Sequence, residues 1–269
     1  MSLTGRAAVL GSPIEHSLSP ILHLAAYQAL DLEWDYGRFE VQVDELAGFV
    51  AELDELWRGL SLTMPLKAEA LRIADEVDDI AGVTRAANTL VRLPHGGWMA
   101  YNTDVVGMVH AIGDVAPGRR FERVVILGAG ATARSAVAAA RDLGAEHVIV
   151  AARRVDAAEE VLDVAVGLGM EGEAAGLEPR AFVADLVIST LPADAAAAWS
   201  EVAEEYLPAV LLDVTYAPWP TTLARAWRGA VARGADLLLW QATEQVRLMT
   251  GCAAPVEAMR AALARYPQE

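Results

Sequence analysis

Lysine and cysteine are almost missing from this chain of 269 residues. The single cysteine, Cys252, excludes an internal disulfide and a cysteine-rich metal site, and we expect no metal cofactor. The single lysine, Lys67, stands against twenty arginines. Two explanations remain open: a general bias toward arginine codons, or a requirement at position 67 for the compact, titratable ammonium that arginine lacks.

Positive charge and long apolar runs are also scarce. The formal net charge of −16 argues against a nucleic-acid-binding surface and against binding to anionic membranes. No apolar run approaches the roughly 20 residues of a membrane span, and the first eleven residues predict no signal peptide. Because 54% of the residues are hydrophobic, wholesale disorder is excluded. We expect a cytoplasmic protein, a monomer or homodimer.

Apolar runs typical of strands alternate with alanine-rich runs typical of helices. Strands are predicted at residues 7–11, 34–41, 59–63, 89–93, 98–102, 124–127, 148–152, 185–190, 209–216 and 237–240. Helices are predicted with Ser19 and Asp44 as N-caps, at 105–112, 131–143, 156–169, 193–199 and 221–234, and twice near the C-terminus. This alternation predicts an α/β fold of mostly parallel sheets covered by helices, and the length suits two domains.

A glycine-rich turn separates the predicted strand 124–127 from an alanine-rich helix. It matches the dinucleotide motif G-x-G-x-x-A with Gly128-Ala129-Gly130-Ala131-Thr132-Ala133. Gly128 permits the tight turn, Gly130 lets the backbone approach a pyrophosphate, and Ala133 lets helix and strand pack closely. The helix N-terminus attracts the anion. An ordinary glycine-rich turn is the alternative, but this context favours a Rossmann-like nucleotide site.

The following strand indicates which dinucleotide binds. An NAD site usually ends this strand with an acidic residue that holds the ribose 2′-hydroxyl. Here the strand ends with Ala152 and is followed by Arg153 and Arg154. Two guanidinium groups suit a 2′-phosphate, although a solvated arginine pair is the alternative. The sequence therefore predicts NADP.

Polar residues follow several predicted strands in the first hundred residues. Ser17, Lys67 and Asp104 each come after a strand, and the carboxyl ends of parallel strands meet at one edge, where ligands bind. Each residue also has a plainer interpretation. Serines such as Ser17 and Ser19 often cap helices, and Asp104 directly precedes a predicted helix.

These polar residues belong to segments that recur in a fixed order. In this order and spacing they are specific, and the chain resembles the shikimate dehydrogenase family over nearly its whole length. The segments are S-x-S-P (17–20), T-x-P-x-K (63–67), N-T-L (88–90), N-T-D (102–104), the nucleotide turn, D-V-T-Y-A-P-W-P-T (213–221) and G-A-D-L-L-L-W-Q-A (234–242).

The resemblance implies a reversible NADP-linked reduction of 3-dehydroshikimate to shikimate. It implies that Lys67 and Asp104 flank the reacting oxygen as an acid/base pair. A nearby ammonium suits the negative charge that hydride transfer creates on a ketone oxygen. The other implied contacts are Ser17 and Ser19 with the substrate carboxylate, helped by Thr63 and Tyr216; Asn88 and Gln241 with ring hydroxyls; and Gly234 with the nicotinamide.

The implied architecture has two domains that close around the ligands. Residues 1–103 and 240–269 would form the substrate domain, and residues 104–239 the NADP domain. The chain departs from the family pattern at Leu24, Ser61, Leu237 and the Ala152-Arg153-Arg154 segment, which concerns fine specificity. A broader quinate/shikimate dehydrogenase and a catalytically silent, metabolite-sensing relative are the alternatives.

Overall fold

The computed structural model describes residues 3–206 and 209–266. The chain divides into two compact units. Unit 1 runs up to Thr103 and resumes at Gln241–Tyr266, whereas unit 2 spans Asp104–Trp240. Each unit contains one six-stranded, mostly parallel sheet with helices on it, so the predicted α/β class is confirmed.

The sheet of unit 1 has the strand order β2-β1-β3-β5-β6-β4. Its strands are β1 (Gly5–Gly11), β2 (Trp34–Glu40), β3 (Trp57–Leu62), β4 (Glu76–Val77), β5 (Thr89–Arg92) and β6 (Trp98–Tyr101). The first three strands run parallel, and β5 is antiparallel to both of its neighbours. The hairpin predicted across residues 94–97 is therefore confirmed. Because β5 runs backwards, its first residues lie beside the end of β3.

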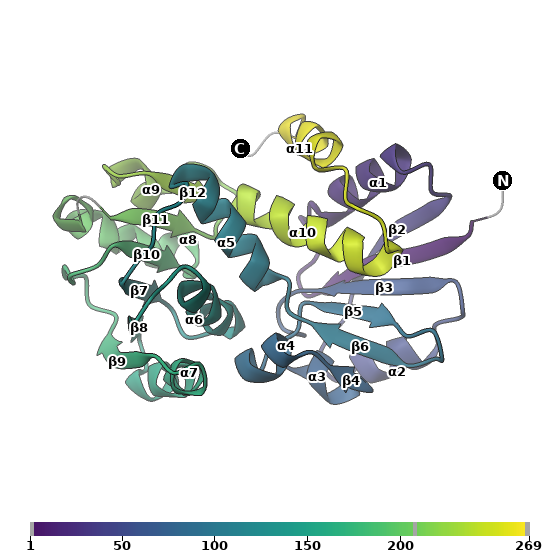
Figure 1. The fold of residues 1–269 in the computed structure, drawn as a ribbon, viewed down its shortest axis with the longest axis horizontal. Coiled ribbons are helices and arrows are strands. Elements are labelled where there is room, and N and C mark those ends of the chain that lie inside the picture. Colours follow the sequence, from purple (N-terminus) through teal and green to yellow (C-terminus); the bar gives the residue numbers. More distant parts are fainter. Residues whose placement is uncertain (1–2, 207–208, 267–269) are drawn as a thin grey trace. The chain divides into compact units, whose positions relative to one another are not determined.

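The two faces of this sheet differ in polarity. One face carries apolar residues such as Ala8, Leu10 and Leu60, which pack with residues from α2 (Leu46–Ala51), α3 (Glu69–Ile73) and α4 (Asp79–Thr84). The other face meets α1 (Ser19–Ala29) and α10 (Gly234–Thr250), and α11 (Val256–Ala264) packs beside α1 (Figure 1). Buried polar side chains collect on this second face.

The sheet of unit 2 is parallel throughout, with the order β12-β11-β10-β7-β8-β9. Its strands are β7 (Arg123–Leu127), β8 (His147–Ala152), β9 (Glu171–Gly176), β10 (Leu186–Ser189), β11 (Val210–Asp213) and β12 (Val231–Arg233). Counted from β7, the order is that of a dinucleotide-binding Rossmann sheet, whose strand order reverses between β7 and β10.

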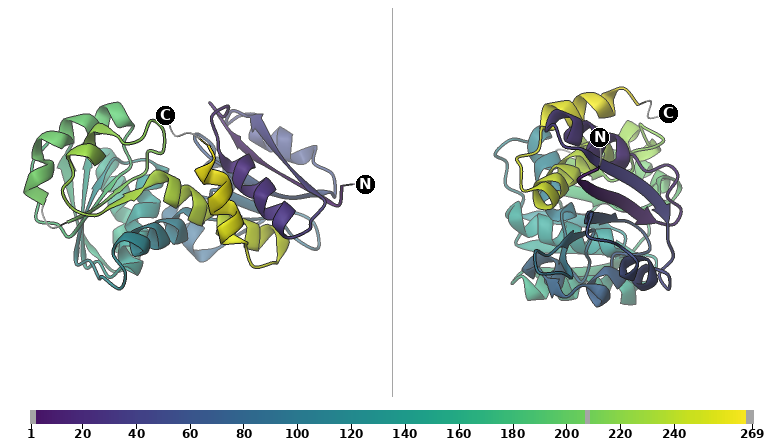
Figure 2. Two further views of the ribbon diagram at one scale, coloured as in Figure 1. Left: turned by 90° about the horizontal axis from the view of Figure 1, so that it is seen from above. Right: turned by 90° about the vertical axis from the view of Figure 1, so that its right-hand side faces the viewer.

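Helices cover both faces of this sheet, as the left view of Figure 2 shows. On one face, apolar side chains of the central strands pack against α8 (Ala193–Ala196), the 3₁₀ helix η1 (Ala197–Tyr206) and α9 (Thr222–Ala226). The remaining helices are α5 (Asp104–Val115), α6 (Ala131–Asp142) and α7 (Val155–Gly167). The small side chains of α6, seven of them buried, let this helix lie close to the strands.

Two predicted segments near the C-terminus are wrong. The helix expected at 221–234 ends at Ala226, because Trp227 turns into the core and its indole N–H donates to the Ala209 carbonyl at 3.1 Å. The chain then forms β12 beside β11. The strand expected at 237–240 lies inside α10, since a four-residue apolar run fits either a strand or a buried helix.

Smaller corrections concern helix starts and one strand. Leu18, not Ser19, occupies the N-cap position of α1, and the hydroxyl of Ser17 accepts from the Ser19 N–H at 3.4 Å. Glu45, not Asp44, precedes α2. The edge strand β9 was not predicted, because its residues Glu171–Gly176 show no apolar alternation.

Candidate active site

The predicted substrate residues of unit 1 lie around the carboxyl edge of its sheet. Ser17 and Ser19 follow β1, and Thr63 and Lys67 follow β3. Asn88 directly precedes β5, which runs antiparallel to β3, and Leu62 N–H donates to the Asn88 carbonyl at 2.7 Å. The parallel and reversed strands thus bring residues from distant parts of the sequence to one edge.

Thr63 and Lys67 are held in a turn beside the end of β1. Thr63 N–H donates to the Leu10 carbonyl at 2.9 Å, and a Cβ on Gly11 would lie 2.4 Å from the Thr63 methyl group. Gly11 is therefore needed for this close approach. The carbonyl of Lys67 accepts from the Ala87 N–H at 2.8 Å, which ties the lysine backbone to the residue preceding Asn88.

Asn88 is a buried amide held on several sides. Its Oδ1 accepts from the backbone N–H of Thr103 at 2.8 Å and from the Thr89 hydroxyl at 2.9 Å. Its Nδ2 donates to Gln241 Oε1 at 3.3 Å. The structure therefore brings together Asn88 and Gln241, the two residues that the family resemblance assigned to ring hydroxyls.

Gln245 is a buried polar residue that the sequence analysis missed. It lies one helical turn after Gln241, and its Nε2 donates to the Asn88 carbonyl at 3.2 Å and to the Thr89 hydroxyl at 2.9 Å. A backbone carbonyl can only accept, so Gln245 Oε1 must face the opposite way, toward Ser61 and His23. The spacing of two glutamines four residues apart on one predicted helix was the available signal.

His23 is fully buried, and its protonation follows from Gln245. Its Nε2 lies 3.2 Å from Gln245 Oε1 and its Nδ1 lies 3.3 Å from the Tyr27 hydroxyl. Nε2 therefore carries the proton and Nδ1 accepts from Tyr27. Burial lowers the His23 pKa to about 3, and the hydrogen bond that His23 donates to Gln245 opposes this only in part. The ring is neutral at physiological pH.

The Ser17 loop is held by an arginine from β2. The Arg38 guanidinium donates to the carbonyls of Glu15 and Ser17, at 2.5 Å and 2.6 Å. The hydroxyls of Ser17 and Ser19 lie 3.3 Å apart. Arg38 was not predicted as a site residue, because a guanidinium that binds backbone carbonyls belongs to no sequence motif.

The N-T-D segment divides into two supporting residues and one carboxylate. Asn102 donates to the Thr84 hydroxyl at 2.9 Å, and Thr103 holds Asn88. Asp104 is buried and is the first residue of α5, so the helix begins one residue earlier than predicted. Asp104 and the half-buried Tyr216 belong to unit 2, whereas Lys67 belongs to unit 1. The pairing of Lys67 with Asp104 as acid and base stays a prediction.

The glycine-rich turn of unit 2 has the shape that a dinucleotide requires. Gly128 has a φ of +111°, and a Cβ there would lie 2.3 Å from the Thr190 hydroxyl. Gly130, by contrast, has no heavy atom within 4 Å of its would-be Cβ, so space lies open above it. Gly130 is the N-cap of α6 and provides no side-chain cap, which leaves the helix N-terminus to an outside anion.

The residues around Gly130 contribute backbone and close packing. Ala129 and Ala131 flank Gly130 in the turn, and Ala133 is fully buried in the first turn of α6. The turn lies at the carboxyl end of β7, where the strand order reverses. These residues fit a pyrophosphate, and their contact with the cofactor stays a prediction.

Two arginines stand at the end of β8, and they differ in their surroundings. Both are exposed. Arg154 lies 3.5 Å from the Asp156 carboxylate, whereas the structure gives Arg153 no ion pair with any residue of 3–206 or 209–266. Arg153 is thus better placed for a phosphate than Arg154, although both were predicted to bind one.

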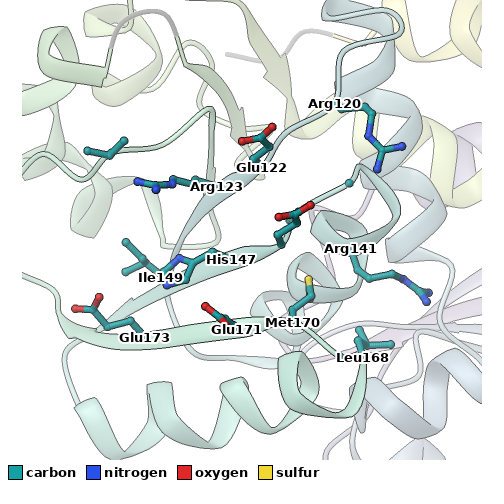
Figure 3. A pocket seen from close by; sticks show the side chains of 15 residues that line it. Arg120, Glu122, Arg123, Arg141, His147, Ile149, Leu168, Met170, Glu171 and Glu173 are labelled. Carbon is teal, nitrogen blue, oxygen red and sulfur yellow. The ribbon is translucent and has the colours of Figure 1, made fainter.

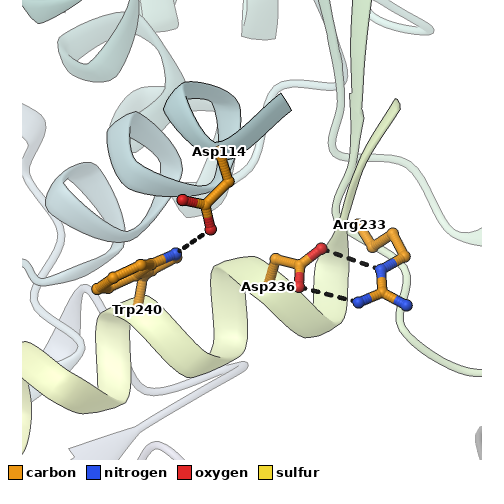
Figure 4. A network of polar contacts seen from close by, with 4 residues as sticks. All are labelled: Asp114, Arg233, Asp236 and Trp240. Atoms are coloured by element: carbon orange, nitrogen blue, oxygen red, sulfur yellow. Dashed lines mark hydrogen bonds and ion pairs between the residues drawn. The ribbon is translucent and has the colours of Figure 1, made fainter. Parts of the chain in front are cut away.

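Gly234 lies where backbone segments nearly touch. A Cβ there would fall 2.2 Å from the Val214 carbonyl oxygen. Arg233 and Asp236 bracket this glycine with two hydrogen bonds of 2.9 Å and 3.0 Å (Figure 4), and the Asp236 carboxylate raises the pKa of Arg233. In α10, which begins at Gly234, the Trp240 indole N–H donates to the Asp114 carboxylate of α5 at 2.8 Å and so holds the two helices together.

A cavity of about 890 Å³ opens at the opposite edge of the unit 2 sheet (Figure 3). It is lined by the starts of β7, β8 and β9, with three arginines interspersed among four glutamates. Parallel sheets bind ligands at their carboxyl ends, and the lining charges offset one another. This cavity is therefore separate from the candidate site.

The described residues contain no metal-binding group and no membrane-spanning helix. Within residues 3–206 and 209–266, no three His, Cys, Asp or Glu side chains form a group that could hold a metal ion. Within the same residues, no helix combines the length and apolar character that crossing a bilayer requires.

Family models and individual relatives both match this chain to shikimate dehydrogenases. Residues 9–90 match the family described as "Shikimate dehydrogenase substrate binding domain", and residues 234–264 match "Shikimate 5'-dehydrogenase C-terminal domain". A relative from Citrifermentans bemidjiense named "Shikimate dehydrogenase (NADP(+))" is 36% identical, covering 98% of this chain and 97% of the relative. One of the same name from Moorella thermoacetica is 33% identical, covering 95% and 91%.

Solved structures agree with these sequence relatives. A shikimate 5-dehydrogenase from Mycobacterium fortuitum has 42% identity and a TM-score of 0.87, covering 97% of this chain and 98% of its own. The enzyme from Thermus thermophilus, solved with NADP(H) and shikimate, has 29% identity and a TM-score of 0.81. Since the similarity extends over both units at 30% identity or more, the chain belongs to the shikimate dehydrogenase family.

Proposed function

We propose that this protein is an NADP-dependent oxidoreductase that interconverts 3-dehydroshikimate and shikimate. One observation carries the proposal: relatives named shikimate dehydrogenase (NADP(+)) match nearly the whole chain, through both units. The arrangement of unit 1 supports it, because hydroxyls and amides dominate its carboxyl edge. Such groups suit a small polyhydroxylated acid.

Some of the candidate site residues bind the substrate and others take part in proton transfer. Ser17 and Ser19, helped by Thr63 and Tyr216, bind the carboxylate, and Asn88 and Gln241 bind ring hydroxyls. Lys67 donates a proton to the substrate oxygen during reduction and takes it back during oxidation. Asp104 orients the lysine and the hydroxyl. When bound, the nicotinamide supplies the hydride.

The nucleotide residues bind and orient the cofactor. The backbone from Gly128 to Ala131 and the start of α6 receive the pyrophosphate, where the open space above Gly130 gives it room. Arg153 and Arg154 bind the 2′-phosphate. Gly234 would contact the nicotinamide through its backbone, since a side chain at this position would collide with the Val214 backbone.

The remaining expectations about partners extend this proposal. The net charge of −16 supports a protein that binds small molecules rather than nucleic acid. One cysteine suits a reducing compartment such as the cytoplasm. Size-exclusion chromatography with light scattering distinguishes a monomer from a homodimer.

The proposal is tested by spectrophotometric assays of shikimate and quinate, each with NADP and with NAD. We expect the highest kcat/KM for shikimate with NADP, by at least about one order of magnitude over shikimate with NAD. Equal activity on quinate would favour the broader quinate/shikimate dehydrogenase. Shikimate binding without turnover would favour a metabolite-sensing relative.

A further inference from the structure

A buried tyrosine connects two of the serines at the carboxyl edge of unit 1. Tyr36, from β2, is only 3% exposed, and its hydroxyl lies 2.6 Å from Ser61 Oγ. The same hydroxyl also interacts with the side chain of Ser19. Its ring is stacked on His23, with centroids 4.0 Å apart and planes inclined by 18°. The phenol therefore has little freedom to move.

The direction of the hydrogen bonds around Tyr36 follows from the backbone carbonyl of Asn88. Gln245 donates to that carbonyl, so Gln245 Oε1 accepts from the Ser61 hydroxyl at 2.8 Å. Ser61 has one proton, which this bond uses, and its oxygen must accept from Tyr36. The Tyr36 proton is therefore directed to Ser61, and the Tyr36 oxygen lies against the Ser19 side chain.

This network joins the two sides of the candidate substrate site. On one side, the Ser17 and Ser19 hydroxyls lie 3.3 Å apart at the start of α1. On the other side, Gln245 connects Ser61 to the backbone of Asn88. Tyr36 lies between these groups, and it spans them with an oxygen that burial keeps protonated, since burial raises its pKa.

We propose that Tyr36 is a positioning residue for the substrate: its hydroxyl fixes the side chain of Ser61 and, with it, that of Ser19, which contacts the acid in the proposed function. This inference rests on the proposed function. It assigns Tyr36 no proton transfer, because its proton is already committed to Ser61. Loss of the hydroxyl should therefore weaken substrate binding while leaving the chemical step and the cofactor largely unaffected.

A second buried tyrosine provides a matched control. Tyr27 is 1% exposed, its ring centroid lies 6.3 Å from that of Tyr36, and it also contacts His23. Its hydroxyl donates to His23 Nδ1 at 3.3 Å rather than to a serine. Tyr36→Phe and Tyr27→Phe thus each remove one buried hydroxyl from the same core. The Tyr36 hydroxyl contacts Ser19 and Ser61, whereas the Tyr27 hydroxyl contacts His23.

The experiment measures steady-state kinetics and melting temperature for the wild type and both variants. We expect Tyr36→Phe to raise the KM for shikimate roughly three- to tenfold, the effect of about one hydrogen bond. We expect kcat and the KM for NADP to stay within about twofold in that variant, and Tyr27→Phe to leave all three values within about twofold. Because both variants delete one buried hydroxyl, their melting temperatures should fall by similar amounts.

A double-mutant cycle tests whether Tyr36 acts through Ser61. In a Ser61→Ala background, Tyr36→Phe should raise the KM for shikimate by a clearly smaller factor than in the wild type. An unchanged KM in Tyr36→Phe, or an equal rise in Tyr27→Phe, overturns the role of Tyr36 while a normally active wild type still supports the proposed function. A wild type that neither binds nor oxidises shikimate overturns the proposed function itself.

Discussion

Unit 1 and unit 2 both place their candidate binding groups at the carboxyl edge of a largely parallel sheet, but they use different atoms. Unit 1 uses side chains that bond to one another, such as Asn88 with Gln241 and Ser61 with Gln245. The glycine-rich turn of unit 2 uses backbone groups, with glycines where a Cβ would collide or fill open space, at Gly128 and Gly130. A substrate with a fixed pattern of hydroxyls needs directed side chains, whereas a pyrophosphate is met by N–H groups at a helix start.

The largest expected effect comes from the single lysine in unit 1. Lys67→Ala should lower kcat by roughly 10²–10⁴, the range for a positioned proton-transfer group, with little change in NADP affinity. Lys67→Arg keeps the charge but cannot release a proton near neutral pH, so it should recover little of the rate. A Lys67→Arg variant that retains more than about a tenth of kcat would contradict proton transfer by Lys67.

In unit 2 the largest expected effect is on the choice of cofactor. Arg153→Ala should weaken NADP by about 1.5–3 kcal/mol, or roughly 10–100-fold, and leave NAD nearly unchanged. Arg154→Ala should cost less, because that guanidinium already lies near Asp156. The measurement is kcat/KM with each cofactor. Equal losses with NADP and NAD would count against binding of the 2′-phosphate by Arg153.

The buried network of unit 1 should make stability depend on pH through His23. Its pKa falls from 6.5 to about 3 on folding, so between these values the unfolded chain binds the proton more readily. Above pH 6.5 His23 is neutral in both the folded and the unfolded chain, and it does not lower the free energy of unfolding. As the pH falls from 7 to 5, protonation of His23 in the unfolded chain lowers the free energy of unfolding by about 2 kcal/mol. Urea unfolding at both pH values measures it.

The control for this measurement is an exposed histidine. His23→Gln should be less stable at pH 7 but should lose less stability than the wild type on going to pH 5. His95→Gln, at an exposed position, should keep the part of the dependence that comes from His23. The same pH dependence in His23→Gln and the wild type would show that other groups cause it.

The smallest expected effect concerns the open backbone of unit 2. Gly130→Ala should raise the KM for NADP about tenfold, or about 1.4 kcal/mol, by placing a methyl group where the pyrophosphate needs room. Its fold should be intact, because nothing lies within 4 Å of that Cβ. Gly113→Ala, in α5 and equally unobstructed, is the control and should leave the KM unchanged. Equal values in both variants would place the pyrophosphate elsewhere.

Local sequence determined the class of fold and the position of the nucleotide turn. The strand 124–127, the glycines that follow it and the alanine-rich helix behind them are adjacent in the chain, so their geometry depends on neighbouring residues. The same holds for the hairpin of β5 and β6, whose turn lies between two apolar runs. Strand and helix periodicity is a local property, and these elements were therefore predictable.

Tertiary structure alone decided the buried network and several elements at the edges of the sheets. Residues 231–233 became a strand by pairing with β11, and 171–176 by pairing with β8, because a partner backbone satisfied their N–H and C=O groups. Gln245 contacts Asn88, Ser61 and His23, which are 157, 184 and 222 residues away in the chain. No local pattern encodes such contacts, since they depend on which polar side chains the fold buries together and leaves to satisfy one another.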